Sequence, residues 1–107
     1  MSLDVRLSET VPTEVYWANI THNLAAMARE AGIYAELWRP DELGLTKARD
    51  LIPVLTAGIA KMKADPDRFR KFDAENGWGT YEKFVPWVER YLDACKEHPD
   101  AEVSVCR

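Results

Sequence analysis

The sequence predicts a small α+β domain that is mostly helical, and three observations support this fold class. Apolar residues alternate with polar ones at both ends of the chain, which is the period of a β-strand. Between the ends, apolar residues recur with the period of an α-helix. The 107 residues are 47% hydrophobic, with only 5 Gly and 6 Pro, which is the size and composition of one globular domain. We therefore expect a single domain over residues 1–107, with three long helices, one short helix and a small ribbon of two terminal strands.

The N-terminal strand is predicted from Leu3, Val5 and Leu7, which would all face one way. Val103 and Val105, with Ala101 before them, give the same pattern at the other end. Two short strands at opposite ends of a helical chain have few partners except each other, and a two-stranded ribbon needs further packing. We expect the two strands to pair in an antiparallel ribbon with helices on one face.

The first helix is predicted over residues 14–31. Pro12 suits a first helical turn, and Gly32 suits the left-handed residue that ends a helix. A connector over residues 33–43 follows, with a short helical turn that brings Tyr34, Leu37 and Trp38 onto the core. The expected apolar face of the helix consists of Trp17, Ile20, Leu24, Met27, Ala28 and Ala31.

Three further helices are predicted in the second half of the chain. A long helix over residues 46–63 would be capped by Thr46, and a short one that starts at Pro66 would be capped by Asp65. The last long helix would follow Thr80 and end before Pro99. Its expected core face consists of Tyr81, Phe84, Val85, Val88, Leu92 and Cys95.

Two prolines, Pro53 and Pro86, fall inside these helical patterns. Proline removes a hydrogen bond from a helix interior and bends the axis. Two interpretations remain open: either the helices start later than their threonine caps suggest, or both helices are kinked.

Charge and composition exclude several classes of function. The net charge of −4 argues against a nucleic-acid partner, because such proteins need a basic face. The sequence contains neither a signal peptide nor a long apolar run, so we expect no membrane partner and a cytoplasmic location. Cys95 and Cys106 are too few for a disulfide framework and wrongly spaced for zinc.

The first polar segment is NITHN at residues 19–23. On the predicted helix, Asn19 and Asn23 share a stripe opposite the core face, with His22 beside it. Asparagine is a poor helix former, so this array of neutral donors and acceptors is unusual on a solvated face. We consider three interpretations: recognition of a small polar ligand, amide hydrogen bonds that hold an adjacent loop, and plain exposure.

The second polar segment is NGWGTY at residues 76–81. Gly77 and Gly79 flank Trp78 and allow the backbone to approach a neighbour closely. With Asn76 at its start, this loop leads into the last helix, whose first N–H groups favour an anion, and Trp78 or Tyr81 could stack on a ring. The alternative is a tight turn whose tryptophan fills the core.

The sequence gives little support for a catalytic function. The two histidines, His22 and His98, have no recognisable catalytic partners, and no serine or cysteine lies in a nucleophile motif. We therefore assign no catalytic residue, no metal site and no cofactor, and favour a protein that is not an enzyme.

The chain resembles a family of small uncharacterised bacterial and bacteriophage proteins. The likeness is carried by the NITHN segment, the LWRP turn at residues 37–40, the NGWGTY segment and the tail over residues 101–107. It implies a stand-alone domain and a phage-related context, in which a protein can inhibit a host factor or a host defence protein. It implies no activity and no site residue.

Our leading hypothesis is a non-enzymatic binding module for a small polar or nucleotide-like ligand. The ligand would lie between Asn19, His22 and Asn23 on one side and residues 76–81 on the other, which requires the two segments to be neighbours. The rival is a protein-interaction or self-associating domain, for example a homodimer. Its surface would be an aromatic patch around Trp87 and Tyr91 on the last helix.

Overall fold

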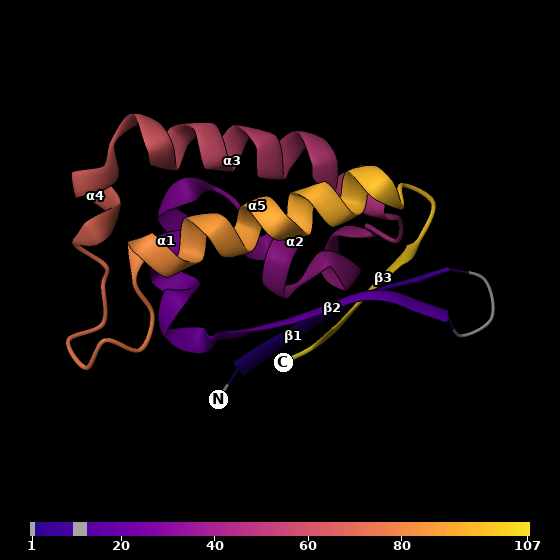
Figure 1. The fold of residues 1–107 in the computed structure, drawn as a ribbon, viewed down its shortest axis with the longest axis horizontal. Helices are drawn as coiled ribbons and strands as arrows, with labels where there is room; N and C mark the ends of the chain where they lie inside the picture. The colour runs from indigo at the N-terminus through magenta and orange to yellow at the C-terminus, as the bar shows by residue number, and fades with distance from the viewer. Residues whose placement is uncertain (1, 10–12) are drawn as a thin grey trace.

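The computed structural model describes residues 2–9 and 13–107, and places one layer of helices on a three-stranded antiparallel sheet (Figure 1). The strands are β1 (Ser2–Glu9), β2 (Thr13–Thr21) and β3 (Glu102–Cys106), in the order β2-β1-β3. Val5 lies opposite Val105 in β3, so the predicted antiparallel pairing of the terminal strands is confirmed. Leu3, Val5 and Leu7 of the central strand are fully buried, as predicted.

Strand β2 corrects the prediction of a first helix over residues 14–31. It pairs with β1 along its whole length, with Ala18 opposite Val5 and Ile20 opposite Leu3, so the sheet has a third strand. Its segment TEVYWANIT is rich in β-branched and aromatic residues, which pack well on a pleated surface. Trp17, expected in the helix core, points to the outer face of the sheet and is 49% exposed. Pro12, the expected first turn of that helix, lies outside the described residues.

The helical structure begins only after β2, with a 3-10 turn η1 (His22–Leu24) and helix α1 (Ala25–Ala31). Gly32 ends α1 at φ 78°, as predicted, because its amide then bonds back to Ala28 and Arg29. The connector contains α2 (Tyr34–Trp38) and the 3-10 turn η2 (Pro40–Leu43). Leu37 and Trp38 are buried and Tyr34 packs against the core, as expected.

The second long helix starts later than predicted. A 3-10 turn η3 (Ala48–Leu51) precedes α3 (Ile52–Ala64), and Pro53 lies in the first turn of α3, where its missing N–H costs nothing. A late start therefore explains Pro53. The short α4 (Pro66–Arg70) begins after Asp65, as predicted, although the Asp65 side chain makes no capping hydrogen bond.

The last helix, α5 (Tyr81–Glu97), runs alongside α3, lies between α3 and the sheet in the view of Figure 1, and contains Pro86 in its interior. All six residues predicted for its core face are buried. Trp87 and Tyr91 are also buried, with exposed fractions of 6% and 1%. The aromatic patch proposed for a partner at these two residues is therefore absent. No helix in residues 2–9 and 13–107 has the length and apolar character needed to cross a membrane.

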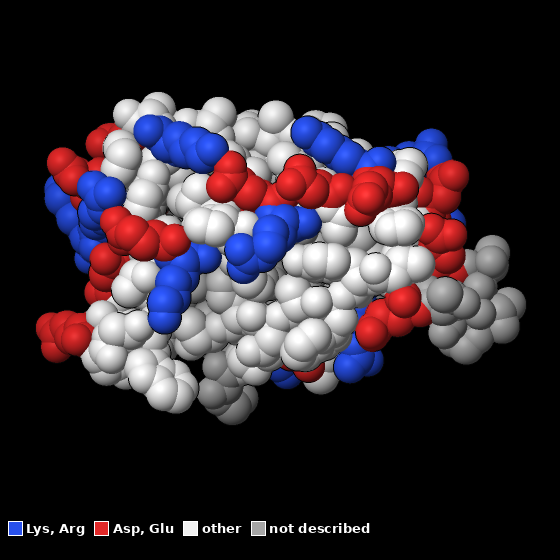
Figure 2. Space-filling model, in the orientation of Figure 1, with Lys and Arg blue, Asp and Glu red and all other residues white. Residues whose placement is uncertain are grey.

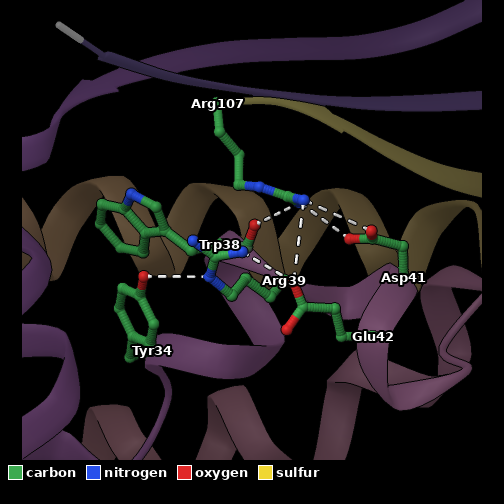
Figure 3. A network of polar contacts seen from close by, with 6 residues as sticks. All are labelled: Tyr34, Trp38, Arg39, Asp41, Glu42 and Arg107. Atoms are coloured by element: carbon green, nitrogen blue, oxygen red, sulfur yellow. Dashed lines mark hydrogen bonds and ion pairs between the residues drawn. The ribbon is translucent and has the colours of Figure 1, made fainter.

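Polar contacts fasten the C-terminal end of β3 to α2 and η2 (Figure 3). The Arg107 guanidinium donates to the Trp38 carbonyl at 3.1 Å and to the Asp41 carboxylate at 2.9 Å. Arg39 extends the network, because it donates to Glu42 at 2.7 Å and to the Tyr34 hydroxyl at 3.4 Å. This network joins the C-terminal end of the chain to the connector over residues 33–43.

Candidate functional site

The two polar segments singled out in the sequence are neighbours. The Asn23 side chain donates from Nδ2 to the Trp78 carbonyl at 2.8 Å, across 55 positions of sequence. Gly79 packs against the same junction of β2 and η1, because a Cβ on Gly79 would lie 3.1–3.2 Å from Thr21, Asn23 and Leu24. Asn23 thus holds the loop, which is one of the interpretations given above.

The loop over residues 73–80 is also fastened by its own hydrogen bonds. Asn76 accepts from the Trp78 amide at 2.9 Å, and the Gly77 amide donates to the Ala74 carbonyl at 3.0 Å. Gly77 and Gly79 take φ values of +76° and +115°, which side chains with a Cβ rarely adopt. The glycines therefore shape a loop of defined conformation.

Trp78 projects from this fastened loop and is 72% exposed. The alternative of a turn whose tryptophan fills the core is therefore wrong. Burying a tryptophan side chain is strongly favourable, so an exposed indole on an ordered loop is unusual for folding alone. The loop thus holds the Trp78 backbone in place and presents its indole ring to solvent.

Two hollows flank Trp78. The first, which we call the α5 groove, has a volume of about 630 Å³ and lies between Thr21 at the end of β2, residues 77–79 of the loop, and Lys83, Trp87 and Arg90 of α5. The second, the outer hollow, has a volume of about 770 Å³ and is lined by Ser2, Asn19, Thr21, His22, Asn23 and Trp78. Both volumes fall within the range of small-molecule sites.

The outer hollow is lined by neutral polar groups whose orientations are set by the fold. The Asn19 amide donates to Ser2 Oγ at 2.9 Å and to the Asp4 carboxylate. His22 Nδ1 accepts a hydrogen bond from the Trp38 indole at 2.8 Å, so the neutral ring carries its hydrogen on Nε2. The Asn19 amide thus uses both of its N–H groups, whereas Asn23 uses one for the Trp78 carbonyl, so the second Asn23 N–H and His22 Nε2–H are the donors left for a ligand.

Tyr81 and the loop amides do not have the roles expected of them. Tyr81 is only 8% exposed and its hydroxyl donates to the Met62 carbonyl at 3.0 Å, so its ring cannot stack on a ligand. The Tyr81 amide donates to Asp73 Oδ1 at 2.7 Å, and the amides of Gly77 and Trp78 bond within the loop. A carboxylate of the protein therefore occupies the anion position at the start of α5.

The sequence reasoning missed the α5 side of the site. Lys83, Trp87 and Arg90 recur at helical spacing, a signal present in the sequence, but Trp87 was assigned only to a partner surface, and Lys83 and Arg90 had no assigned role. Trp87 fastens α5 to the edge of the sheet by donating from its indole to the Asn19 carbonyl at 3.0 Å. In Figure 2, charged side chains gather along the helical layer, whereas the surface toward the sheet is largely uncharged.

The described residues contain no cluster of three or more His, Cys, Asp and Glu side chains that could hold a metal ion. Burial raises the pKa of the Cys95 thiol to about 12, so this thiol is protonated at neutral pH and is a poor nucleophile. The two hollows bring together an exposed aromatic ring, side-chain amide groups and two basic side chains. No protein-family model, no curated protein and no solved structure matches the chain.

Proposed function

We propose that the protein is a non-enzymatic binding module for a small polar ligand with a planar ring, which stacks on Trp78. One observation carries this proposal: Trp78 is 72% exposed on a loop held by hydrogen bonds at Asn23, Ala74 and Asn76. A loop whose backbone is held in advance loses little conformational freedom when a ligand binds, which favours affinity.

The hollows beside Trp78 supply the polar partners of such a ligand. His22 Nε2–H and the Thr21 hydroxyl line the outer hollow, and Thr21 also lines the α5 groove. Asn19 and Asn23 support the site, because their amides hold the surrounding strand and loop in place. Ligands of the nucleoside and nucleotide class combine a planar ring with hydrogen-bonding groups and fit this arrangement.

A thermal-shift screen of the purified protein tests the proposal with nucleosides, nucleotides and sugar phosphates. A ligand at 100 times its dissociation constant stabilises the fold by about 2.7 kcal/mol, which raises the melting temperature of a domain of this size by several degrees. We expect at least one ring-bearing compound to give such a shift, and Trp78→Ala to abolish it.

Trp17→Ala is the matched control, because Trp17 is also an exposed tryptophan and lies on the outer face of the sheet, away from both hollows. The Trp17 variant should keep the full shift. Absence of any shift across the whole screen, or equal loss in both variants, would count against the proposal.

A second candidate function, self-association, is favoured by a different observation. Trp17 lies on the outer sheet face beside the Arg6–Glu14 ion pair, where the helices leave the sheet uncovered. If this face joins two copies, the protein sediments as a dimer and Trp17→Ala converts it to a monomer. A wild-type monomer at high micromolar concentration would remove this candidate.

A further inference from the structure

The α5 groove carries two basic side chains with no acidic partner. Lys83 and Arg90 both line the groove, and neither forms an ion pair with any residue in the ranges 2–9 and 13–107. Some basic side chains of the helical layer are paired, for example Lys63 with Glu89 at 2.6 Å. Both side chains of the groove, Lys83 and Arg90, therefore place an unpaired positive charge on its wall.

The carboxylate in the groove is already paired with a basic residue outside it. Glu82 also lines the groove, but its Oε1 accepts from Arg70 Nε at 2.8 Å, and this bond lowers the pKa of Glu82. The groove therefore has an excess of positive charge, although the chain as a whole has a net charge of −4. A hollow lined by positive charge attracts anionic ligands to that place. The net negative charge of the whole chain does not attract anions to the rest of the surface.

The spacing of the two cations sets the size of the anion. Lys83 and Arg90 are seven residues apart on one face of α5, about 10 Å along the helix axis. Trp87 lies between them on the helix, and Trp78 also lines the groove. One phosphate group is too small to reach both basic groups and a ring stacked on Trp78, whereas a chain of two or three phosphates is long enough.

We propose that the α5 groove binds a nucleoside di- or triphosphate, whose ring stacks on Trp78 and whose phosphates contact Lys83 and Arg90. This inference rests on the proposed function, since it uses the same tryptophan. It specifies in addition that the ligand carries a chain of phosphate groups. Arginine and lysine side chains are the usual partners of phosphate oxygens, and charge-assisted hydrogen bonds are the stronger ones.

Calorimetric titration with guanosine, GMP, GDP and GTP, and with the matching adenine series, tests the inference. Divalent cations are left out so that they do not mask the phosphate charge. We expect the dissociation constant to fall with each added phosphate. Lys83→Ala and Arg90→Ala should each raise the dissociation constant for the triphosphate by about tenfold and leave nucleoside binding unchanged.

Two controls separate specific from general effects of charge. Lys96→Ala removes a basic residue of α5 that lies outside the groove, and should leave the dissociation constant for the triphosphate unchanged. Inorganic tripolyphosphate lacks a ring, so it should bind more weakly than the nucleoside triphosphate and respond to Lys83→Ala but not to Trp78→Ala.

The outcomes distinguish this inference from the proposed function. If nucleosides bind as tightly as triphosphates and neither Lys83→Ala nor Arg90→Ala changes affinity, the ligand is neutral, and the inference fails while the binding function stands. If the triphosphate binds but Lys96→Ala weakens it as much as Lys83→Ala, the groove is not the phosphate site. If no compound of either series binds, this inference is overturned, and the wider thermal-shift screen then decides the proposed function.

Discussion

Two tyrosines on α5 differ in how their buried hydroxyl groups are satisfied. The Tyr81 hydroxyl donates to the Met62 carbonyl at 3.0 Å. Within the described part of the chain, the Tyr91 hydroxyl has no hydrogen-bond partner, and burial raises the pKa of that hydroxyl. Its ring stacks on Tyr16 with centroids 5.8 Å apart, so the ring contributes packing while the oxygen loses its hydration.

Tyr91→Phe is therefore expected to leave the free energy of unfolding unchanged or to raise it by about 1 kcal/mol, because it removes an unsatisfied polar atom and keeps the ring. Tyr81→Phe should instead lower it by about 1 kcal/mol, because it breaks a buried hydrogen bond. Urea unfolding of both variants measures the difference. A larger loss in Tyr91→Phe than in Tyr81→Phe would show that this reading of the two hydroxyl groups is wrong.

At the scale of elements, the loop over residues 73–80 depends on two glycines in different surroundings. Both have positive φ, but a Cβ at Gly77 would meet no atom within 4 Å, whereas a Cβ at Gly79 would crowd Thr21, Asn23 and Leu24. The first glycine is needed for backbone conformation alone. The second also allows the loop to pack against the end of β2.

Gly77→Ala should lower the free energy of unfolding by about 1 kcal/mol through backbone strain. Gly79→Ala should lower the free energy of unfolding by more than Gly77→Ala, because it adds a steric clash. It should also move Trp78 and weaken ligand binding. Chemical denaturation and ligand titration of the two variants check this order. Equal effects of the two substitutions would contradict the close packing of Gly79.

Pro86 is the remaining irregularity of α5. As an interior helix residue it leaves the Glu82 carbonyl without its usual amide partner, and it also lines the α5 groove. Pro86→Ala should raise the free energy of unfolding by about 1–2 kcal/mol, since alanine restores the helical hydrogen bond. Denaturant unfolding of the variant measures this change in free energy. A loss of stability would indicate that the proline is needed for packing.

The elements differ in how well the sequence predicts them. β1 and α5 each have one apolar face with a clear period, and both were predicted correctly. β2 was missed because Trp17, Ile20 and Leu24 mimic a helical stripe, although Trp17 is exposed on the sheet. The richness of its segment in β-branched and aromatic residues was the local signal for a strand, and it outweighs the apparent helical period.

The candidate site was predictable only in part, because it is assembled by the whole molecule. The loop containing Trp78 could be found from its glycines, whereas its contact with Asn23 spans 55 positions and depends on the correct fold. Tyr81 looked available in the sequence, but the packing against Met62 buries it. Lys83 and Arg90 became candidates only once the groove was visible, since unpaired surface cations are common in any helix.

Ion pairs that join distant segments make the stability of the molecule depend on pH. Hydrogen bonds from Arg107 lower the pKa of Asp41, and those from Arg70 lower the pKa of Glu82, from ordinary values of 3.8 and 4.5. Both carboxyl groups therefore bind protons less readily in the folded state than in the unfolded state. Their contribution to the free energy of unfolding is fully present at a pH above the ordinary pKa values, and it is lost as the pH falls through the lowered pKa values.

Arg107→Ala should accordingly reduce the free energy of unfolding at pH 7. The gap, which is the difference in this free energy between the wild type and the variant, should narrow as the pH is lowered from 4 toward 2. The Asp41 carboxyl group that pairs with Arg107 is exposed, so the effect should also shrink in high salt. Urea unfolding at several pH values measures the gap. A gap that stays constant down to pH 2 would show that Arg107 acts only through the Trp38 carbonyl.

The central claim is that a ring-bearing ligand binds against Trp78, and the indole N–H signals of the four tryptophans in a nitrogen-15 correlation spectrum test it most directly. The spectrum is recorded during titration with the compounds that shift the melting temperature. We expect the Trp78 signal to move in a saturable way, while the signal of the exposed Trp17 stays in place. A Trp78 signal that does not move while a ligand demonstrably binds would contradict the claim.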